Sequence, residues 1–179
     1  DVRDAVRDGK ALVTARLGTA AERPVLRIGS RPGSVVAVSV VTPYEQLRYR
    51  VFLLVSRGQT ASPAVIARLA HRVRYRVDFV VRAHGASPGD RAFLQRFGPA
   101  TLATAAGLLP AAPPQRTGPA AGPNAAPPGE LPGGLVIYRF DLSSAAARGV
   151  RVGSLTGTLD FSEGASPHHA IAFDLGRYR

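Results

Sequence analysis

The sequence predicts a mainly β protein: an antiparallel β-sandwich, immunoglobulin-like only in a loose sense, with two or three short helices inserted between strands. The first observation is the segment 74–82, RYRVDFVVR, where apolar and polar residues alternate as in a half-buried strand. The second is the presence of about eight such segments separated by turns, and the third is the lack of regular βαβ alternation. The likeness to antibody domains stops there, because the chain has no Cys and no Trp.

The domain organisation follows from length and composition. A chain of 179 residues with 45% hydrophobic residues is long enough and apolar enough to bury a core, so we expect one β-sandwich domain over residues 1–179. Pro, Ala and Gly dominate residues 110–134. Such a segment buries too little side chain to offset its ordering entropy, so we expect a long exposed loop or linker within the domain.

Three strands are predicted in the first part of the chain, after a short helix or loose arm at residues 1–8. Residues 10–17, KALVTARL, alternate like a first strand, and residues 25–28 are expected to pair back with it. Residues 35–41 form a nearly unbroken run of β-branched side chains, which predicts a more buried third strand.

A helix is predicted to begin at Pro43 and to end near residue 57. Thr42 as the cap, Pro43 at the first helical position and Glu45 three residues after the cap form a capping box. Leu47, Val51 and Leu54 are spaced to lie against the sheet on one face of that helix. The alternative is a strand over residues 47–55, because the same letters also alternate locally.

The same entry signal occurs twice more. Ser62 and Pro63 predict a helix from 63 to about 72, and Ser87 and Pro88 predict a short helix that ends near Phe97.

The last third of the chain returns to strand patterns. Residues 100–105 are expected to form a weak strand, and residues 135–142 and 169–175 alternate clearly. Residues 150–161 read as one long strand whose inward positions change phase near Gly153, which predicts a β-bulge there.

Composition also suggests a compartment. The chain has no Met, so removal of an export signal is the plainest explanation, and an excerpt from a longer chain is the alternative. We therefore expect an exported protein, periplasmic or at the cell surface of a bacterium. No apolar run reaches the roughly 20 residues of a membrane helix, so we expect no transmembrane segment.

The motifs of the common enzyme classes are missing. The sequence lacks a phosphate-binding loop, a dinucleotide-binding glycine pattern, a nucleophile elbow and a zinc-protease helix motif. We therefore expect a non-catalytic protein without a cofactor.

One hairpin is the best candidate for chemistry. Asp160, Glu163, His168 and His169 lie close along the chain, and carboxylates with imidazoles can bind a divalent ion or act as acid and base. A metal-dependent hydrolase is therefore one alternative function. An exposed turn is the more ordinary interpretation, because Ser, Gly and Pro surround these residues and adjacent histidines on a strand point to opposite faces.

Other titratable residues have ordinary interpretations. His71 and His84 flank the strand at 74–82 and read as solvated histidines at the ends of elements. Asp78, Asp141 and Asp174 occupy outward strand positions near arginines, so we expect surface ion pairs.

Arginine provides the strongest positive signal, since the net charge is +11 and the chain holds 23 Lys and Arg residues. Such charge attracts acidic proteins, anionic lipids or nucleic acid, although arginine usage of this kind also fits a GC-rich genome. The candidate docking residues are Arg48, Arg50, Arg72, Arg74, Arg76 and Arg82.

These observations favour an accessory subunit that docks through a basic surface and loops onto an acidic protein surface of a larger assembly, such as the outward face of a membrane-bound complex. Nucleic-acid binding is the alternative that the charge supports. It is less favoured because Tyr75 and Phe79 are expected on the buried face of their strand, where they cannot stack on bases. The identity of the partner and the oligomeric state stay open.

Overall fold

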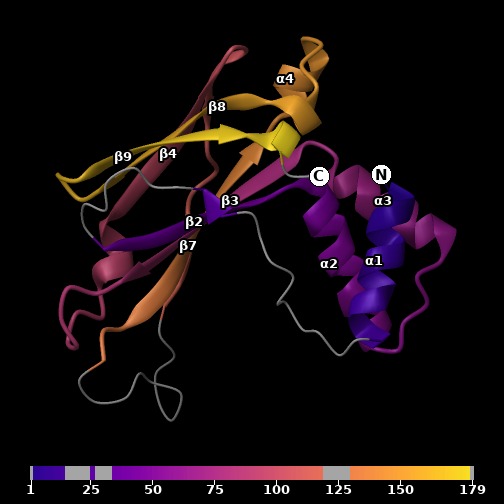
Figure 1. Ribbon diagram of the computed structural model, residues 1–179, viewed down its shortest axis with the longest axis horizontal. Helices are drawn as coiled ribbons and strands as arrows, with labels where there is room; N and C mark the ends of the chain where they lie inside the picture. The colour runs from indigo at the N-terminus through magenta and orange to yellow at the C-terminus, as the bar shows by residue number, and fades with distance from the viewer. Residues whose placement is uncertain (1, 15–24, 27–33, 119–129, 178–179) are drawn as a thin grey trace.

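The computed structural model describes residues 2–14, 25–26, 34–118 and 130–177. The protein is mainly β, with two antiparallel sheets packed in a sandwich-like arrangement and a group of helices beside them (Figure 1). The first sheet has the strand order β1-β2-β3-β7-β6, and the second has the order β5-β4-β8-β9. We call them sheet A and sheet B.

Sheet A is built around its central strand. Its strands are β1 Val25–Leu26, β2 Val35–Val41, β3 Arg76–His84, β6 Gln115–Thr117 and β7 Gly133–Asp141. β3 pairs along its whole length with β7 and also pairs with β2. The prediction of a central strand is confirmed, but it begins at Arg76 rather than at residue 74.

Sheet B is formed by two hairpins. Its strands are β4 Phe97–Thr104, β5 Gly107–Pro110, β8 Thr156–Glu163 and β9 His168–Asp174. β4 pairs with both β5 and β8, and β8 pairs with β9. Gly107 has a φ of +105°, a conformation that glycine adopts without strain, so it suits the tight turn between β4 and β5.

The main core lies between the two sheets. Alternate residues of β3 and β7 point toward sheet B. Phe79 contacts Phe140 within sheet A and Phe173 in sheet B, both edge to face, at centroid distances of 5.7 and 5.3 Å. The buried Tyr138 keeps its hydroxyl satisfied by donating to the carbonyl oxygen of Gly98 at 3.1 Å. Aromatic packing across the sandwich therefore joins the two sheets.

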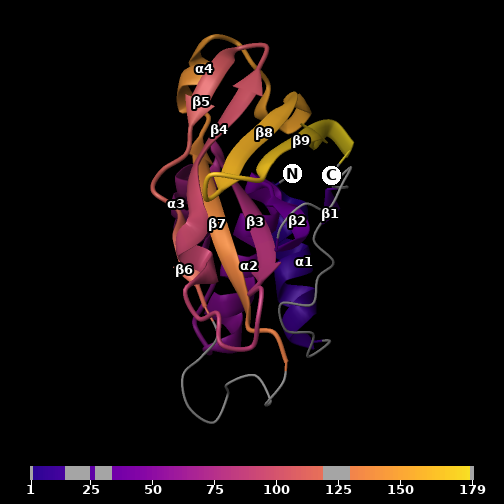
Figure 2. The same ribbon diagram turned by 90° about the vertical axis from the view of Figure 1, so that its left-hand side faces the viewer.

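A second, smaller core belongs to three helices: α1 Val2–Thr14, α2 Pro43–Ser56 and α3 Pro63–Val73. Its buried members are Ala5, Leu47, Val51 and Val73. α1 and α2 approach so closely at Gly9 that an added Cβ would lie 2.5 Å from the carbonyl oxygen of Arg48. Sheet A lies between sheet B and these helices in Figure 1, and in Figure 2, which is viewed from the side of sheet B, the helices are behind the strands.

The cap signals for α2 and α3 are confirmed. The Thr42 hydroxyl accepts a hydrogen bond from the backbone N–H of Glu45, and the Ser62 hydroxyl accepts one from Val65, both at 3.4 Å. The alternative of a strand over residues 47–55 is wrong. The face of α2 that carries Leu47 and Val51 was expected to lie on the sheet, but it packs against the other helices.

The predicted first strand at 10–17 is wrong where the structure describes it, because residues 10–14 continue α1. Residues 15–17 lie outside the described residues. The predicted strand at 25–28 is confirmed for Val25 and Leu26, which pair with β2. Its residues 27 and 28 also lie outside the description.

Three further boundaries differ from expectation. The helix expected over 88–97 is limited to the short 3₁₀ turn η1 Phe93–Arg96. The long strand expected from residue 150 begins only at Thr156, after the 3₁₀ turn η2 Val152–Ser154. The phase change at Gly153 therefore marks a turn and not a bulge. The Pro/Gly-rich segment contributes β6 to sheet A, while residues 119–129 lie outside the described part.

The remaining short elements are α4 Ser143–Ala147, which follows β7, and the 3₁₀ turn η3 Leu175–Arg177, which follows β9. Within the described residues, no helix combines the length and the apolar character that crossing a bilayer requires.

Candidate functional site: an arginine groove on sheet A

A groove of about 260 Å³ opens where the end of α3, the start of β3 and the end of β7 meet. Arginine side chains and one carboxylate provide most of its polar lining, and we call it the arginine groove. Its charged lining residues are Arg72, Arg76, Arg139 and Asp141. Tyr75 and Phe140 also border the groove, but the Phe140 ring is buried in the main core.

Strand pairing brings these side chains together. β3 and β7 run antiparallel, with Arg76 opposite Asp141 and Asp78 opposite Arg139. Residues that are directly opposite in an antiparallel pair have side chains on the same face, within about 5.5 Å of each other. These four residues point away from the main core, so the register alone gathers two guanidinium groups and two carboxylates at one place.

Asp78 lies at the centre of this charge network. Arg76 donates to it through two hydrogen bonds, from Nε to Oδ1 at 2.9 Å and from Nη2 to Oδ2 at 2.6 Å. The Nε of Arg139 lies 3.5 Å from Asp78 Oδ1. The ion pairing with arginine expected at Asp78 is present, but it is buried and not at the surface, since Asp78 is only 6% exposed. Val80, which shares a face of β3 with Asp78, is also buried. This outer face of β3 is therefore covered here as well as the face toward the main core.

Cationic charge exceeds anionic charge around the groove. Arg50 of α2 is half-buried, and its burial, together with the neighbouring guanidinium groups of Arg76 and Arg72, lowers its pKa. The charge of Asp78 raises the pKa of Arg50, but the lowering by burial and by the other guanidinium groups is larger. Arg72 is exposed and forms no ion pair with the residues that the structure describes. Four guanidinium groups therefore surround two carboxylates.

One donor in the groove has no hydrogen-bond acceptor within the described residues. Arg139 Nε is buried and makes no hydrogen bond, although Nη2 of the same residue donates to the Gln115 side chain at 3.1 Å. A guanidinium group presents several N–H donors in a plane and matches a carboxylate bidentately. Arg139 Nε itself is buried and faces Asp78, so the exposed guanidinium group of Arg72 is the one that an additional anionic group can reach directly.

The six predicted docking residues divide into two sets. Arg50, Arg72 and Arg76 gather at the arginine groove. The others lie elsewhere: Arg48 donates to Glu45 at 2.6 Å on α2, and Arg74 lies over the Tyr75 ring at 4.9 Å. Arg82 is exposed on β3, six residues from Arg76 and therefore about 20 Å further along the strand.

Arg139 is the groove residue that sequence reasoning missed. Its strand was recognised, and its outward direction followed from the alternation of LVIYRFDL. The missing information was that β7 pairs with β3 in a register that sets Arg139 opposite Asp78. The sequence contains no local signal for that pairing.

The hairpin formed by β8 and β9 separates its four candidate ligands into two pairs. His168 lies 3.5 Å from Asp160 on the solvent side, whereas His169 lies 3.7 Å from Glu163 in the interior. Among the residues that the structure describes, no group of three or more such side chains is close enough to hold a metal ion. The arrangement therefore gives no support to the metal-dependent hydrolase.

The interior pair belongs to a polar cluster that connects the two sheets. Glu163 Oε2 accepts from the backbone N–H of Ser34 at 3.0 Å, and Oε1 accepts from the Ser34 hydroxyl at 2.6 Å. The His169 ring stacks on Phe161 at 4.7 Å, and burial lowers the pKa of His169, while Glu163 opposes that shift. We call Ser34, Glu163 and His169 the interior cluster.

The remaining candidates have local roles. His84 Nδ1 contacts the carbonyl oxygen of Gly85 at 2.8 Å, and His71 is exposed at the end of α3. Asp141 accepts from the backbone N–H of Ser143 at 2.8 Å, and Asp174 pairs with Arg177 at 3.2 Å.

Comparisons of this chain with protein-family models, with curated proteins and with solved structures gave no match. The arginine groove is therefore the feature of this chain that points to a function.

Proposed function

We propose that this chain is a non-catalytic binding module, an accessory subunit that docks an acidic segment of a larger protein assembly in the arginine groove. The observation that carries the proposal is the charge balance: Arg50, Arg72, Arg76 and Arg139 surround only Asp78 and Asp141. An entering carboxylate meets guanidinium groups on elements that are already folded: β3, β7, α2 and α3. Preorganised donors lower the entropic cost of binding.

An acidic protein segment is favoured over nucleic acid by the shape and lining of the groove. Single-stranded nucleic acid needs a long basic track with exposed aromatic rings for stacking. The arginines of this chain do not form such a track, because Arg48 is paired with Glu45 and Arg82 lies far along β3. Tyr75 is half-buried and packs against the main core, with Arg74 over its ring.

Fluorescence anisotropy tests the proposal, with a labelled hexaglutamate peptide as the probe and labelled single-stranded DNA as the competing class. We expect the peptide to bind more weakly as salt rises, since exposed charges are screened. Arg72→Ala should weaken peptide binding by about tenfold, which corresponds to about 1.4 kcal/mol. Arg72 suits this test because its side chain is exposed, so the fold should tolerate its removal.

Arg82→Ala is the matched control, because Arg82 is also an exposed arginine but lies outside the groove. Equal losses in both variants would show that only the overall charge attracts the peptide. Tighter binding of the DNA than of the peptide, with the same dependence on Arg72, would replace the proposal with nucleic-acid binding.

We further propose that the protein is exported and docks at the outward face of a membrane-bound complex. We also propose that its sandwich is immunoglobulin-like in the loose sense. The net charge of +11 supports docking to an acidic surface but names no partner. Native mass spectrometry of the protein isolated from its own source tests this part. A monomer without any protein partner, recovered from the cytoplasm, would contradict it.

A further inference from the structure

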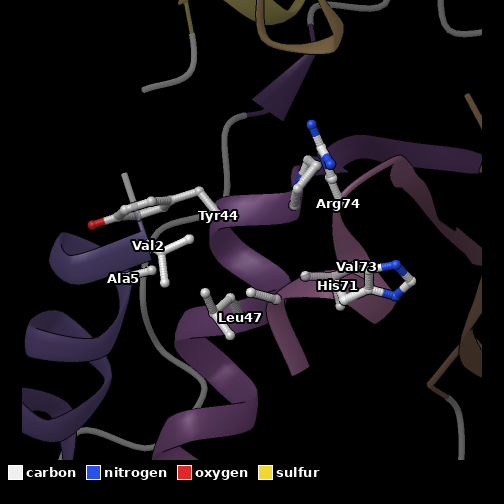
Figure 3. Close-up of a pocket in the computed structure, with 9 residues that line it drawn as sticks. Val2, Ala5, Tyr44, Leu47, His71, Val73 and Arg74 are labelled. Atoms are coloured by element: carbon white, nitrogen blue, oxygen red, sulfur yellow. The ribbon is translucent and has the colours of Figure 1, made fainter. Parts of the chain in front are cut away.

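A second cavity lies among the three helices, and His71 is the lining residue that it shares with the arginine groove. It has a volume of about 450 Å³, and α1, α2 and the end of α3 form its walls (Figure 3). Volumes of about 300 to 1,000 Å³ are typical of small-molecule sites. We call it the helical cavity.

The walls of the helical cavity are mainly carbon. Ala5, Leu47 and Val73 belong to the second core, and the other aliphatic lining residues are Val2, Pro43 and Ala70. Apolar walls favour an apolar occupant, because burial removes hydrocarbon surface from water.

Tyr44 contributes its ring to the wall while its hydroxyl is occupied elsewhere. The hydroxyl donates to Asp8 Oδ2 on α1, and Figure 3 shows it directed away from Leu47 and Val73. Burial and the hydrogen bond to Asp8 raise the pKa of Tyr44 to about 12, so the phenol stays neutral. Tyr44 therefore adds apolar surface and no charge to the cavity.

One cationic group, Arg74, lies at an edge of the cavity, beside His71. Arg74 and His71 are on the side opposite Val2 and Tyr44 (Figure 3). Arg74 is exposed, and its guanidinium group contacts the Tyr75 ring. Within the part of the chain that the structure describes, no carboxylate forms an ion pair with Arg74. Its charge is available to a ligand that enters from this edge.

We propose that the helical cavity binds a small amphipathic anion: a molecule with an apolar body and one carboxylate, such as a medium-chain fatty acid. The body would occupy the space between Leu47, Ala70 and Val73, and the carboxylate would lie at the edge near Arg74. A neutral apolar molecule would leave the cation without a partner, and a cationic amphiphile would be repelled by it. This inference is independent of the arginine groove.

Sodium decanoate, below the concentration at which it forms micelles, is the probe for this site. In ¹H–¹⁵N NMR spectra we expect saturable shifts of the amides of Ala5, Leu47, Ala70 and Val73. Decyltrimethylammonium has a similar chain with the opposite charge, and butyrate has the carboxylate with a much shorter body. Both should bind at least about tenfold more weakly than decanoate.

Two variants address the two halves of the proposed ligand. Ala70→Leu places a larger side chain in the cavity from a half-buried position on α3, and Arg74→Ala removes the edge cation. Each should weaken decanoate binding by about tenfold or more. Arg68→Ala is the matched control, because Arg68 is an exposed arginine on the same helix and does not line the cavity.

Arg72→Ala should leave decanoate binding unchanged, and this separates the helical cavity from the arginine groove. Several results would overturn the inference: no saturable shifts, equal binding of decyltrimethylammonium, shifts confined to the groove, or an equal loss in Arg68→Ala. Shifts of the cavity amides that depend on protein concentration alone would show that a second copy covers this face. If Ala70→Leu fails to fold, Arg74→Ala with the two control amphiphiles still decides the question.

Discussion

Two carboxylates are buried to nearly the same extent in this protein, Glu163 at 5% and Asp78 at 6% exposure, but their surroundings differ. Glu163 lies in the interior cluster and accepts both of its closest hydrogen bonds from one neutral residue, Ser34. Arg96 is more distant, with its Nε 3.9 Å from Glu163 Oε1. Asp78 instead accepts two hydrogen bonds from the cationic Arg76 and has further arginines nearby.

The difference shows why burial of a charged group does not by itself indicate a functional site. Glu163 joins the beginning of β2 to the end of β8, residues that are 129 positions apart, and its hydrogen bonds serve the fold. Around Asp78 there are more arginines than one buried carboxylate can neutralise. The excess positive charge is therefore available to an anionic partner at the groove. Charge balance, more than burial, separates the structural carboxylate from the one in the candidate site.

The largest effect is expected from Glu163→Ala. The substitution leaves the buried N–H and hydroxyl of Ser34 without an acceptor, so the free energy of unfolding should fall by about 3–5 kcal/mol. Urea denaturation measures this loss. Glu163→Gln keeps one acceptor oxygen and should lose about half as much, and the exposed Glu130→Ala should lose almost nothing. Equal losses at Glu163 and Glu130 would contradict the structural role.

Asp78→Asn should separate stability from binding. Arg76 loses its charge-assisted hydrogen bonds, so the free energy of unfolding should fall by about 1.5–3 kcal/mol. At the same time the groove loses one negative charge, so it should bind the hexaglutamate peptide more tightly. Denaturation and anisotropy measure the two quantities, with Asp160→Asn on sheet B as the control. Weaker peptide binding by a folded Asp78→Asn protein would show that the peptide does not enter the groove.

A third prediction concerns the pH dependence of the interior cluster. Burial lowers the pKa of His169 in the folded state, whereas the unfolded chain keeps a value near 6.5. The unfolded chain therefore binds more protons just below that pH, and stability should fall as the pH drops through about 6.5. The slope for one proton is at most about 1.4 kcal/mol per pH unit, and it ends where the folded His169 also titrates.

His169→Gln tests this dependence, because it removes the titrating group while Glu163, His168 and Arg96 remain around the site. Urea denaturation between pH 7.5 and pH 5 should give a flatter stability profile for the variant than for the wild-type protein. His168→Gln changes the exposed neighbour and should keep the wild-type profile. An unchanged profile in His169→Gln would show that His169 does not control it.

The smallest effect is expected from Arg96→Ala. The Arg96 side chain is 40% exposed, pairs with Asp90 at 2.8 Å and reaches Glu163 only at 3.9 Å. Exposed ion pairs contribute about 1 kcal/mol or less, so the free energy of unfolding should fall by less than about 1 kcal/mol. A loss comparable to that of Glu163→Ala would mean that Glu163 depends on a cation after all, and the contrast with Asp78 would disappear.

Local signals in the sequence predicted much of the secondary structure. The β-branched run at 35–41 became β2 with the expected bounds, because such side chains suit a pleated, buried surface. The starts of α2 and α3 followed from Thr42–Pro43 and Ser62–Pro63, because a cap satisfies orphan N–H groups within a few residues. These interactions lie within one turn of the chain, so the sequence alone contains them.

The segment 10–17 shows where local patterns fail. Its alternation is compatible with a strand, but residues 10–14 are helical because they extend α1, which packs closely on α2 around Gly9. Contact with a partner helix stabilises a helix more than intrinsic propensity does. The sequence pattern contains no information on which partner is available.

For the candidate site, the sequence determined that arginines would exceed carboxylates and that Arg76 and Arg139 would point outward from their strands. Only the tertiary structure decided which of them meet: the β3–β7 register set Arg139 opposite Asp78, and α2 brought Arg50 beside them. The same structure separated Asp160 and His168 from Glu163 and His169. Charge and alternation are properties of single residues and short segments, whereas a site depends on pairings between distant strands, and those follow from packing of the whole chain.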